Sequence, residues 1–449
     1  MLVSIAGIGR GLFVLSAVAL IAASAPGQAD PLVVTWDEKL KVASGDGYRG
    51  PWRMNESEFD YVDDPTVAIT EQGFVGVAWV DQSQQDIFFQ VYGPDGKARL
   101  GEPANVSGSP RVFSWLPRMV MASGDASDVY VLWQEIVFSG GTHGGEIFFA
   151  RSTNGGRTFS DAINLSNTIA GDGKGRLTPR NWHNGSLDLA SGPQGDLYAT
   201  WTEYEGNLWF SRSTDLGNSF SDPLRVAGGP DAKPARGPSL AIGAEGSIYL
   251  AWTVGEDKAA NIHFAKSVDH GRSFSAPRVI FERDGHADAP KIAVDGRATV
   301  HLVYAESPTG PFERYHIRYT RLNGGAHVFE GPREISSPLT RRFESASFPA
   351  LSLDNDDNIY VTWELFPSRR SYSQGLGFSY SSDGGRTFAS PSVIPGSVDP
   401  ALGVNGSQQG LLMRKLVVNG AGAIAVVNST FKKNQASHIW LTRGQAPGR

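Results

Sequence analysis

A repeated strand pattern runs through most of this chain and restricts the folds open to it. In each repeat an alternating apolar segment carries a large aromatic residue at the same position: Trp79, Trp133, Trp201, Trp252, Tyr304 and Trp363. A second short apolar segment follows each of them, at 87–89, 147–149, 208–210, 262–264, 317–319 and 376–378. Alternation with a period of two predicts antiparallel β-strands. Radial repetition of four-stranded sheets predicts an all-β fold, a β-propeller.

The number of blades follows from the first strand of each repeat. We expect these strands to begin near Pro65, Pro117, Ser186, Pro238, Pro290, Pro349 and Arg414. This predicts seven four-stranded antiparallel blades, with six blades and an irregular sheet as the alternative. The last repeat lacks an outer strand, which residues 32–36 or 39–43 could supply. Pairing of the N- and C-terminal segments would then close the ring and leave no free sheet edge.

A turn motif recurs between the third and fourth strands of the repeats. Residues 381–388 read Ser-x-Asp-x-Gly-x-Thr-Phe; segments 213–220 and 267–274 have Ser in place of Thr, and segment 152–159 has Asn in place of Asp. We expect the Ser and Asp side chains to bond backbone amides, the glycine to take a positive φ, and the aromatic residue to pack into the sheet. These turns resemble the Asp boxes, or BNR repeats, of exported bacterial sialidase-like propellers. The motif is expected to be structural rather than catalytic.

The N-terminus is typical of a secretory signal peptide. Arg10 precedes an apolar segment at 12–23, and the small residues Gly27 and Ala29 stand before Asp30. The apolar run is shorter than the ~20 residues of a membrane span. We therefore predict cleavage after residue 29, a single propeller domain at 30–449, no membrane span in the mature protein, and a periplasmic or secreted location.

Composition excludes several kinds of site. The chain has no cysteine, which excludes a lipoprotein anchor, disulfides, thiolate metal sites and a cysteine nucleophile. Its formal net charge of −6 and the lack of a basic stripe in the sequence argue against nucleic acid as a partner. Residues 354–358 have the composition of a calcium loop but lack the glycine and distant glutamate of an EF-hand, so we predict an ordinary turn. No cofactor and no metal are expected, and the protein is expected to be a monomer.

One end of the predicted propeller gathers side chains that could act on a carbohydrate. The entrance of each first strand and the exit of each second strand lie at this end, which we call the funnel face, and the repeated turns lie at the other end. Candidate catalytic residues are Asp81, His183, Glu203, Glu364 and Tyr372. Candidate substrate-binding residues are Trp115, Arg118, Trp182, Arg236 and Arg414. Glycoside hydrolysis uses two carboxyl groups, arginines suit an anionic sugar, and aromatic faces can stack on sugar rings.

The resemblance to sialidase-like propellers implies particular roles for some of these residues. It implies an exo-sialidase or related glycosidase, with Asp81 as acid/base, Arg236 and Arg414 as carboxylate ligands, and Tyr372 with Glu364 as a nucleophile pair. Catalytic members of that family also carry an Arg-Ile-Pro motif, which this chain lacks. The nearest segment is Tyr48–Pro51.

Two other functions fit the same residues. A polysaccharide lyase would need a histidine or tyrosine base near an acidic sugar, for which His183, His286 and Tyr204 are the candidates. A non-catalytic propeller would bind a glycan or an envelope protein at the funnel face. An acid close behind the strand aromatic recurs in blade after blade, which favours a structural role for each acid and so favours the binding function.

Overall fold

A computed structural model describes the strands and most of their connections. The described residues are 34–46, 61–109, 113–122, 128–139, 142–168, 186–203, 206–229, 231–282, 285–311, 313–337, 342–369, 371–398, 404–405, 414–431 and 435–446. The predicted signal peptide lies outside these ranges. Residues Val33–Arg449 form one compact unit. Regular structure in the described ranges is β-strand, and none of it is a helix that could cross a membrane.

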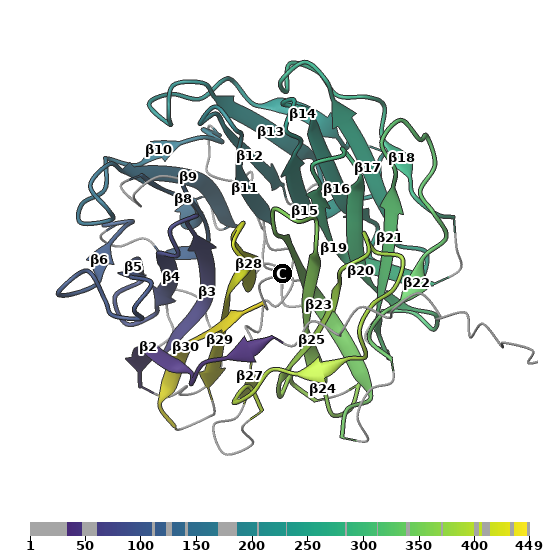
Figure 1. Cartoon of the computed structure of the whole chain (residues 1–449). Coiled ribbons are helices and arrows are strands. Elements are labelled where there is room, and N and C mark those ends of the chain that lie inside the picture. The colour runs from purple at the N-terminus through teal and green to yellow at the C-terminus, as the bar shows by residue number, and fades with distance from the viewer. Residues whose placement is uncertain are drawn as a thin grey trace, which may run out of the picture. The chain divides into compact units, whose positions relative to one another are not determined.

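Six consecutive four-stranded antiparallel sheets form blades 1 to 6. Their strands, from the innermost outward, are as follows: blade 1, β3 (Val62–Ile69), β4 (Val75–Asp81), β5 (Asp86–Tyr92), β6 (Ala104–Asn105); blade 2, β7 (Phe113–Met121), β8 (Val129–Ser139), β9 (Thr142–Ser152), β10 (Ile163–Asn164); blade 3, β11 (Leu187–Ser191), β12 (Leu197–Thr202), β13 (Leu208–Ser213), β14 (Leu224–Ala227); blade 4, β15 (Ala235–Ile242), β16 (Ile248–Val254), β17 (Asn261–Ser267), β18 (Arg278–Val279); blade 5, β19 (His286–Val294), β20 (Val300–Ser307), β21 (His316–Leu322), β22 (Arg333–Glu334); blade 6, β23 (Ser345–Leu353), β24 (Ile359–Phe366), β25 (Leu376–Ser381), β26 (Ser392–Val393). Figure 1 shows β3, β11, β15, β19 and β23 toward the centre and the short fourth strands at the periphery.

Blade 7 joins the two ends of the chain. Its strands are β27 (Val404–Asn405), β28 (Leu416–Val418), β29 (Ala423–Phe431), β30 (Ser437–Gln445), β1 (Thr35–Trp36) and β2 (Leu40–Gly45). Both N-terminal strands pair with β30, with Thr35 opposite Gln445 and Leu40 opposite Leu441. The predicted all-β, seven-bladed propeller closed by its terminal segments is therefore confirmed.

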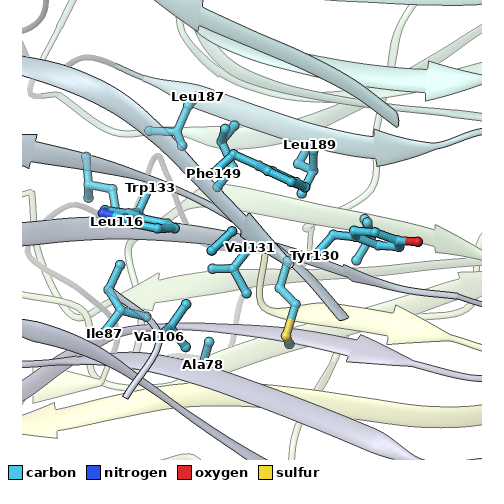
Figure 2. Packing of buried hydrophobic residues seen from close by; sticks show 14 of the residues in the cluster. Ala78, Ile87, Val106, Leu116, Tyr130, Val131, Trp133, Phe149, Leu187 and Leu189 are labelled. Carbon is cyan, nitrogen blue, oxygen red and sulfur yellow. The ribbon is translucent and has the colours of Figure 1, made fainter. Parts of the chain in front are cut away.

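The core lies between adjacent blades, where the repeated aromatic residues pack. Six second-strand aromatics are at most 3% exposed: Trp79, Trp133, Trp201, Trp252, Tyr304 and Trp363. Figure 2 shows one such contact region, in which Trp133 and Phe149 of blade 2 lie among Leu187 and Leu189 of blade 3 and Ile87 of blade 1. Burial of apolar surface on both faces of every blade therefore stabilises the ring without disulfides.

The turns between third and fourth strands connect each blade to the one before it. In blade 3, Gly217 N donates to Ser213 Oγ (2.9 Å), Ser219 N donates to Asp215 Oδ1 (2.9 Å), and Gly217 has φ +78°. Phe220, which ends the turn, packs edge-on against Phe149 of blade 2 with ring centroids 4.8 Å apart. The turns in blades 2, 4 and 6 repeat the serine-to-glycine contact and the aromatic contact with the preceding blade. The local geometry expected from the motif is present.

Replacing Gly217 with alanine is expected to lower the free energy of unfolding by about 2–4 kcal/mol, because the positive φ and overpacking each cost about 1–2 kcal/mol. A Cβ atom at this position would lie 2.7 Å from Phe149. Urea denaturation measures the change. Gly331→Ala is the matched control, since a Cβ atom there meets no atom within 4 Å, and equal effects of the two changes would contradict the prediction.

Candidate functional site

A bulge at a proline shapes the innermost strand of five blades. The strand register shifts at the dipeptides Asp64–Pro65, Leu116–Pro117, Gly237–Pro238, Ala289–Pro290 and Phe348–Pro349. The residue before each proline has a positive φ, between 48° and 58°. A bulge re-aims the side chains that follow it. The residue after the proline consequently occupies the same place in each of these blades.

These equivalent positions form a level around the propeller axis that we call the axial layer: Thr66, Arg118, Asp188, Ser239, Lys291, Ala350 and Lys415. Arg118 lies opposite Leu132, and Lys291 opposite Val303, so each faces the residue just before the blade's aromatic. Asp188 has the same place in blade 3 without a proline. Arg414 directly precedes Lys415 and contacts Asp188, so we count it with the layer. Four basic side chains and one acid are thereby gathered from four blades.

A central cavity of about 460 Å³ adjoins the axial layer. Asp188, Lys291 and Arg414 lie at its charged end, and Ser239 and Ala350 of the layer also line it. Its walls are formed by the innermost strands, expose both polar and apolar atoms, and extend to the far ends of these strands, at Ile242, Val294, Leu353 and Val418. The funnel face predicted from the sequence is at the opposite ends of these strands, so this cavity extends from the charged layer away from that face.

Arg414 is fixed to blade 3, whereas Arg118 keeps an unused donor. Arg414 Nη2 lies 2.8 Å from Asp188 Oδ1 and donates to the carbonyl of Leu189 at 2.7 Å. Arg118 is 3% exposed, and its Nη1 donates to the carbonyl of Pro117 at 2.8 Å. Its Nη2 is buried and has no hydrogen-bond partner among the described residues. Burial lowers the pKa of Arg118 to about 10, which leaves it cationic at neutral pH.

Lys291 is a perturbed amine of the layer that lines the cavity. Its pKa is lowered to about 7, chiefly by burial; Asp188 opposes the shift, and the charges of Arg118, Arg414 and Lys415 add to it. No hydrogen bond or ion pair joins Lys291 Nζ to another residue of the described ranges. Its side chain is partly exposed and lines the cavity. A substantial fraction of this amine is therefore neutral near pH 7.

Lys415 forms a buried ion pair with Glu364 of blade 6. Lys415 Nζ lies 2.5 Å from Glu364 Oε1, and the two residues are 0% and 1% exposed. Burial raises the pKa of Glu364, and Lys415 opposes this shift. Burial likewise lowers the pKa of Lys415, opposed by Glu364. The pair links blades 6 and 7 beside the layer.

A second charged cluster joins blades 4 and 5 near the strand entrances. Arg236 Nη2 lies 3.2 Å from Asp288 Oδ2 and 3.2 Å from His286 Nε2. Burial raises the pKa of Asp288, but Arg236 and His286 outweigh this effect and hold the pKa at about 2. His286 is 2% exposed, its Nδ1 contacts the carbonyl of Asp257 at 2.7 Å, and its ring packs edge-on against Tyr315. Both nitrogens of His286 are engaged, which suits a positioning role better than contact with a substrate.

The other candidates from the sequence make local contacts. Asp81 accepts from the backbone amide and hydroxyl of Ser83, at 3.0 and 2.6 Å, which caps a turn. Glu203 accepts from Asn207 at 3.0 Å. Tyr372 is 63% exposed.

Three further candidates, Trp182, His183 and Tyr204, lie outside the described residues. Trp115 is 5% exposed and donates its ring N–H to Asp64. Arg118 and Arg414 are thus brought together at the layer, while Arg236 belongs to the neighbouring cluster.

Three charged residues of the layer are not among the sequence-predicted candidates: Asp188, Lys291 and Lys415. The sequence could have identified Lys291, because this residue directly follows the proline of the blade's innermost strand, as Arg118 does. The described residues contain no group of three or more potential side-chain ligands that could hold a metal ion. Asp354 caps its own turn, accepting from Asp356 N and Asn358 N at 3.0 and 2.9 Å.

Comparison with known proteins identifies similar folds but no matching family. No protein-family model and no curated protein matches the chain. Among solved structures, the polysaccharide lyase Uly1 superposes with a TM-score of 0.54 at 11% identity, over 92% of this chain and 99% of that one. An ulvan lyase of a polysaccharide lyase family gives 0.53 at 13% identity over 85% and 94%. A protein of unknown function from Dyadobacter fermentans gives 0.50 at 15% identity over 91% and 99%. These similarities establish a shared propeller fold.

Proposed function

We propose that this chain is a carbohydrate-acting propeller that binds the acidic group of a glycan at the axial layer. The observation that carries the proposal is the buried, unused Nη2 donor of Arg118 beside Arg414 and Lys291. A buried donor without a partner is costly, and a guanidinium pairs most strongly with a carboxylate or sulfate group. The cavity gives such a group access to the charged end of the axis.

β-Elimination from a uronic acid is the chemistry that this layer supports best. Elimination requires a base and cations that neutralise the sugar carboxylate, and the layer offers several cations. Hydrolysis instead requires two carboxyl groups flanking the bond. Asp188 is bound to Arg414 and to the amide of Leu240, and Glu364 is buried against Lys415. Neither carboxylate is available to act on a glycosidic bond in this arrangement.

The fold is compatible with this activity, since two structurally similar propellers are polysaccharide lyases. One of them is described in complex with a glucuronate–sulfated rhamnose polymer, so a uronate-containing polysaccharide is the substrate class we propose. Export after cleavage at residue 29 would bring the protein to such a polymer. Hydrolysis by an exo-sialidase or another glycosidase is the second candidate, because the turns of blades 2, 3, 4 and 6 have the local geometry expected of the sialidase-like motif.

The test is product formation by the purified mature protein. Ulvan, alginate and polygalacturonate are offered as polymers, and a fluorogenic sialoside as the hydrolysis probe. Ultraviolet absorbance of an unsaturated uronate would establish elimination, whereas release of sialic acid would establish hydrolysis. Absence of both products, with no binding of any of these glycans, would refute a carbohydrate-acting propeller. Binding without any product would establish a non-catalytic binding propeller in its place.

Arg414→Ala is expected to lower kcat/KM about 10- to 100-fold, because a hydrogen bond to a charged group contributes about 1.5–3 kcal/mol. Arg414→Lys should retain part of the activity, since it keeps the charge. Arg369→Ala is the control: this residue is 49% exposed and pairs with Glu313 at the surface. Equal activities of the Arg414→Ala and Arg369→Ala proteins would exclude the layer as the binding site.

A further inference from the structure

We propose that Lys291 is the general base of this site and that the substrate is a glycan with a uronate linked through O4 near its end, whose carboxylate binds Arg414 at the charged end of the cavity, near the buried guanidinium of Arg118. The proposal rests on the proposed function and names its catalytic residue. Three observations support it: the place of Lys291 in the cavity together with its lack of a partner, the cations around it, and its burial.

The first observation is position. Lys291 is on β19, where the bulge at Ala289–Pro290 turns the following residue to the axial layer. It is a titratable side chain at the charged end of the cavity, together with Asp188 and Arg414. Asp188 is already bound to Arg414 Nη2 at 2.8 Å. Among the three charged residues that line this end of the cavity, Lys291 is therefore the one whose charged group has no partner in the described structure and can bind a ligand.

The second observation is the set of charges around the amine. Arg118 of β7, Arg414 and Lys415 preceding β28, and Asp188 of β11 all act on Lys291. The flanking innermost strands, β15 and β23, have Ser239 and Ala350 at the same level. The three cations favour the neutral amine, which is the form that can accept a proton, and Asp188 opposes them.

Burial at the charged end of the cavity is the third observation. Burial disfavours the charged amine. Ile242, Val294 and Leu353 line the cavity beyond the layer. The same burial strengthens the attraction of the two guanidinium groups for a carboxylate. A cavity of about 460 Å³ with one charged end suits the end of a sugar chain.

The reaction balances without an oxidant or a cofactor. Arg118 and Arg414 neutralise the uronate carboxylate, which makes the proton on C5 more acidic. The lone pair of Lys291 Nζ takes that proton, and the C5–H electron pair forms the C4–C5 double bond. The C4–O4 bond breaks, its electron pair leaves with O4, and O4 takes a proton from water. The hydroxide left by that water takes the proton from Lys291 Nζ, which restores the neutral amine. The products are an unsaturated uronate and a shortened or released sugar.

Competitive acetylation tests the amine independently of catalysis. The mature protein is labelled with trace acetic anhydride between pH 5 and 10, with Nα-acetyl-lysine as internal standard, and modification of Lys291 is measured by peptide mass spectrometry. Half-maximal labelling near pH 7 is expected, in keeping with the pKa of about 7. Labelling that follows the standard, near the ordinary lysine pKa of about 10.4, would overturn the proposal.

The catalytic role is tested with variants on the polymer that the wild type cleaves. Lys291→Met should lower kcat about 10²–10⁴-fold, the usual effect of removing a general base, while polymer binding persists. Lys291→Arg should be equally inactive, because it keeps the charge but cannot accept a proton at neutral pH. Lys258→Met, at an exposed site, is the control. The wild-type kcat/KM should rise with pH through about 7, and activity retained by Lys291→Met would overturn the base role.

The two proposals fail in distinguishable ways. A wild-type protein that forms no product from any polymer refutes the proposed function, and the base role falls with it. A wild-type protein that forms an unsaturated product, with Lys291→Met fully active, leaves the proposed function standing and refutes only the role of Lys291.

Discussion

The Lys415→Met protein is expected to be about 3–5 kcal/mol less stable to unfolding than the wild type, because it leaves a buried carboxylate unpaired. Lys415 is fully buried, and its Nζ lies 2.5 Å from Glu364 Oε1. Methionine fills a similar volume, so the loss of the charge accounts for most of the change. Urea denaturation at pH 7 measures the effect.

The double variant Lys415→Met/Glu364→Leu separates charge from packing. Replacing both members of a buried pair with apolar groups is often neutral, so most of the stability should return. A double variant no more stable than Lys415→Met would contradict this explanation. It would indicate that the loss of stability comes from packing between blades 6 and 7 rather than from the unpaired carboxylate.

The stability of Lys415→Met should also depend on pH through Glu364. Burial already raises the pKa of Glu364 above its ordinary value of 4.5, and removal of Lys415 raises it further. A group with a raised folded-state pKa contributes stability that is complete below its unfolded pKa and is lost as pH rises through the folded value. The stability of the Lys415→Met protein should therefore be closest to that of the wild type near pH 4. The difference in the free energy of unfolding should grow as the pH rises above that value.

The blades could be predicted from the sequence because their determinants are local. Alternation of apolar residues, an aromatic at a fixed place and a short turn motif each act within a few residues of the chain. The pairing of the N-terminal segments with blade 7 could also be predicted, since that blade lacks a strand of its own. The structure places both segments, β1 and β2, on β30, where the sequence offers them as alternatives.

The axial layer could not be predicted in the same way because it depends on register. The bulge at each proline decides which residue faces the axis, and blade 3 reaches the same level with Asp188 and no proline. Lys415 finds its partner 51 residues earlier in the chain, in another blade. No local pattern indicates such a contact.

The repeat also gives a misleading prediction of the roles of individual acidic residues. Glu135 and Glu306 stand two residues after the strand aromatic and Glu364 stands one residue after it, and each has different partners. Glu135 accepts from Trp133, Glu306 pairs with Arg318 at 2.7 Å, and Glu364 pairs with Lys415. A shared position in the repeat therefore fixes the place of a side chain but not its chemistry.

Phe149→Ala is expected to lower the free energy of unfolding by about 3–5 kcal/mol, the usual cost of deleting a buried phenylalanine ring. Phe149 is fully buried, stacks on Tyr130 within blade 2 and receives Phe220 of blade 3 edge-on. The backbone of Gly217 also lies against its ring, since a Cβ there would approach to 2.7 Å. One substitution therefore removes both the core of blade 2 and the surface on which the next blade's turn rests.

Hydrogen exchange distinguishes these two consequences. The amides of Gly217 and Ser219, which are bonded to Ser213 and Asp215, should lose protection in Phe149→Ala beyond what the global change predicts. Phe149→Leu should lower the free energy of unfolding by less than about 1.5 kcal/mol, because leucine keeps most of the side-chain volume. Val268→Ala, at a site 75% exposed, is the control and should change stability by no more than about 0.5 kcal/mol. Unchanged exchange at Gly217 and Ser219 would show that the turn holds its form without the preceding blade. The motif would then act within its own blade, and the coupling of neighbouring blades would have to come from the second-strand aromatics.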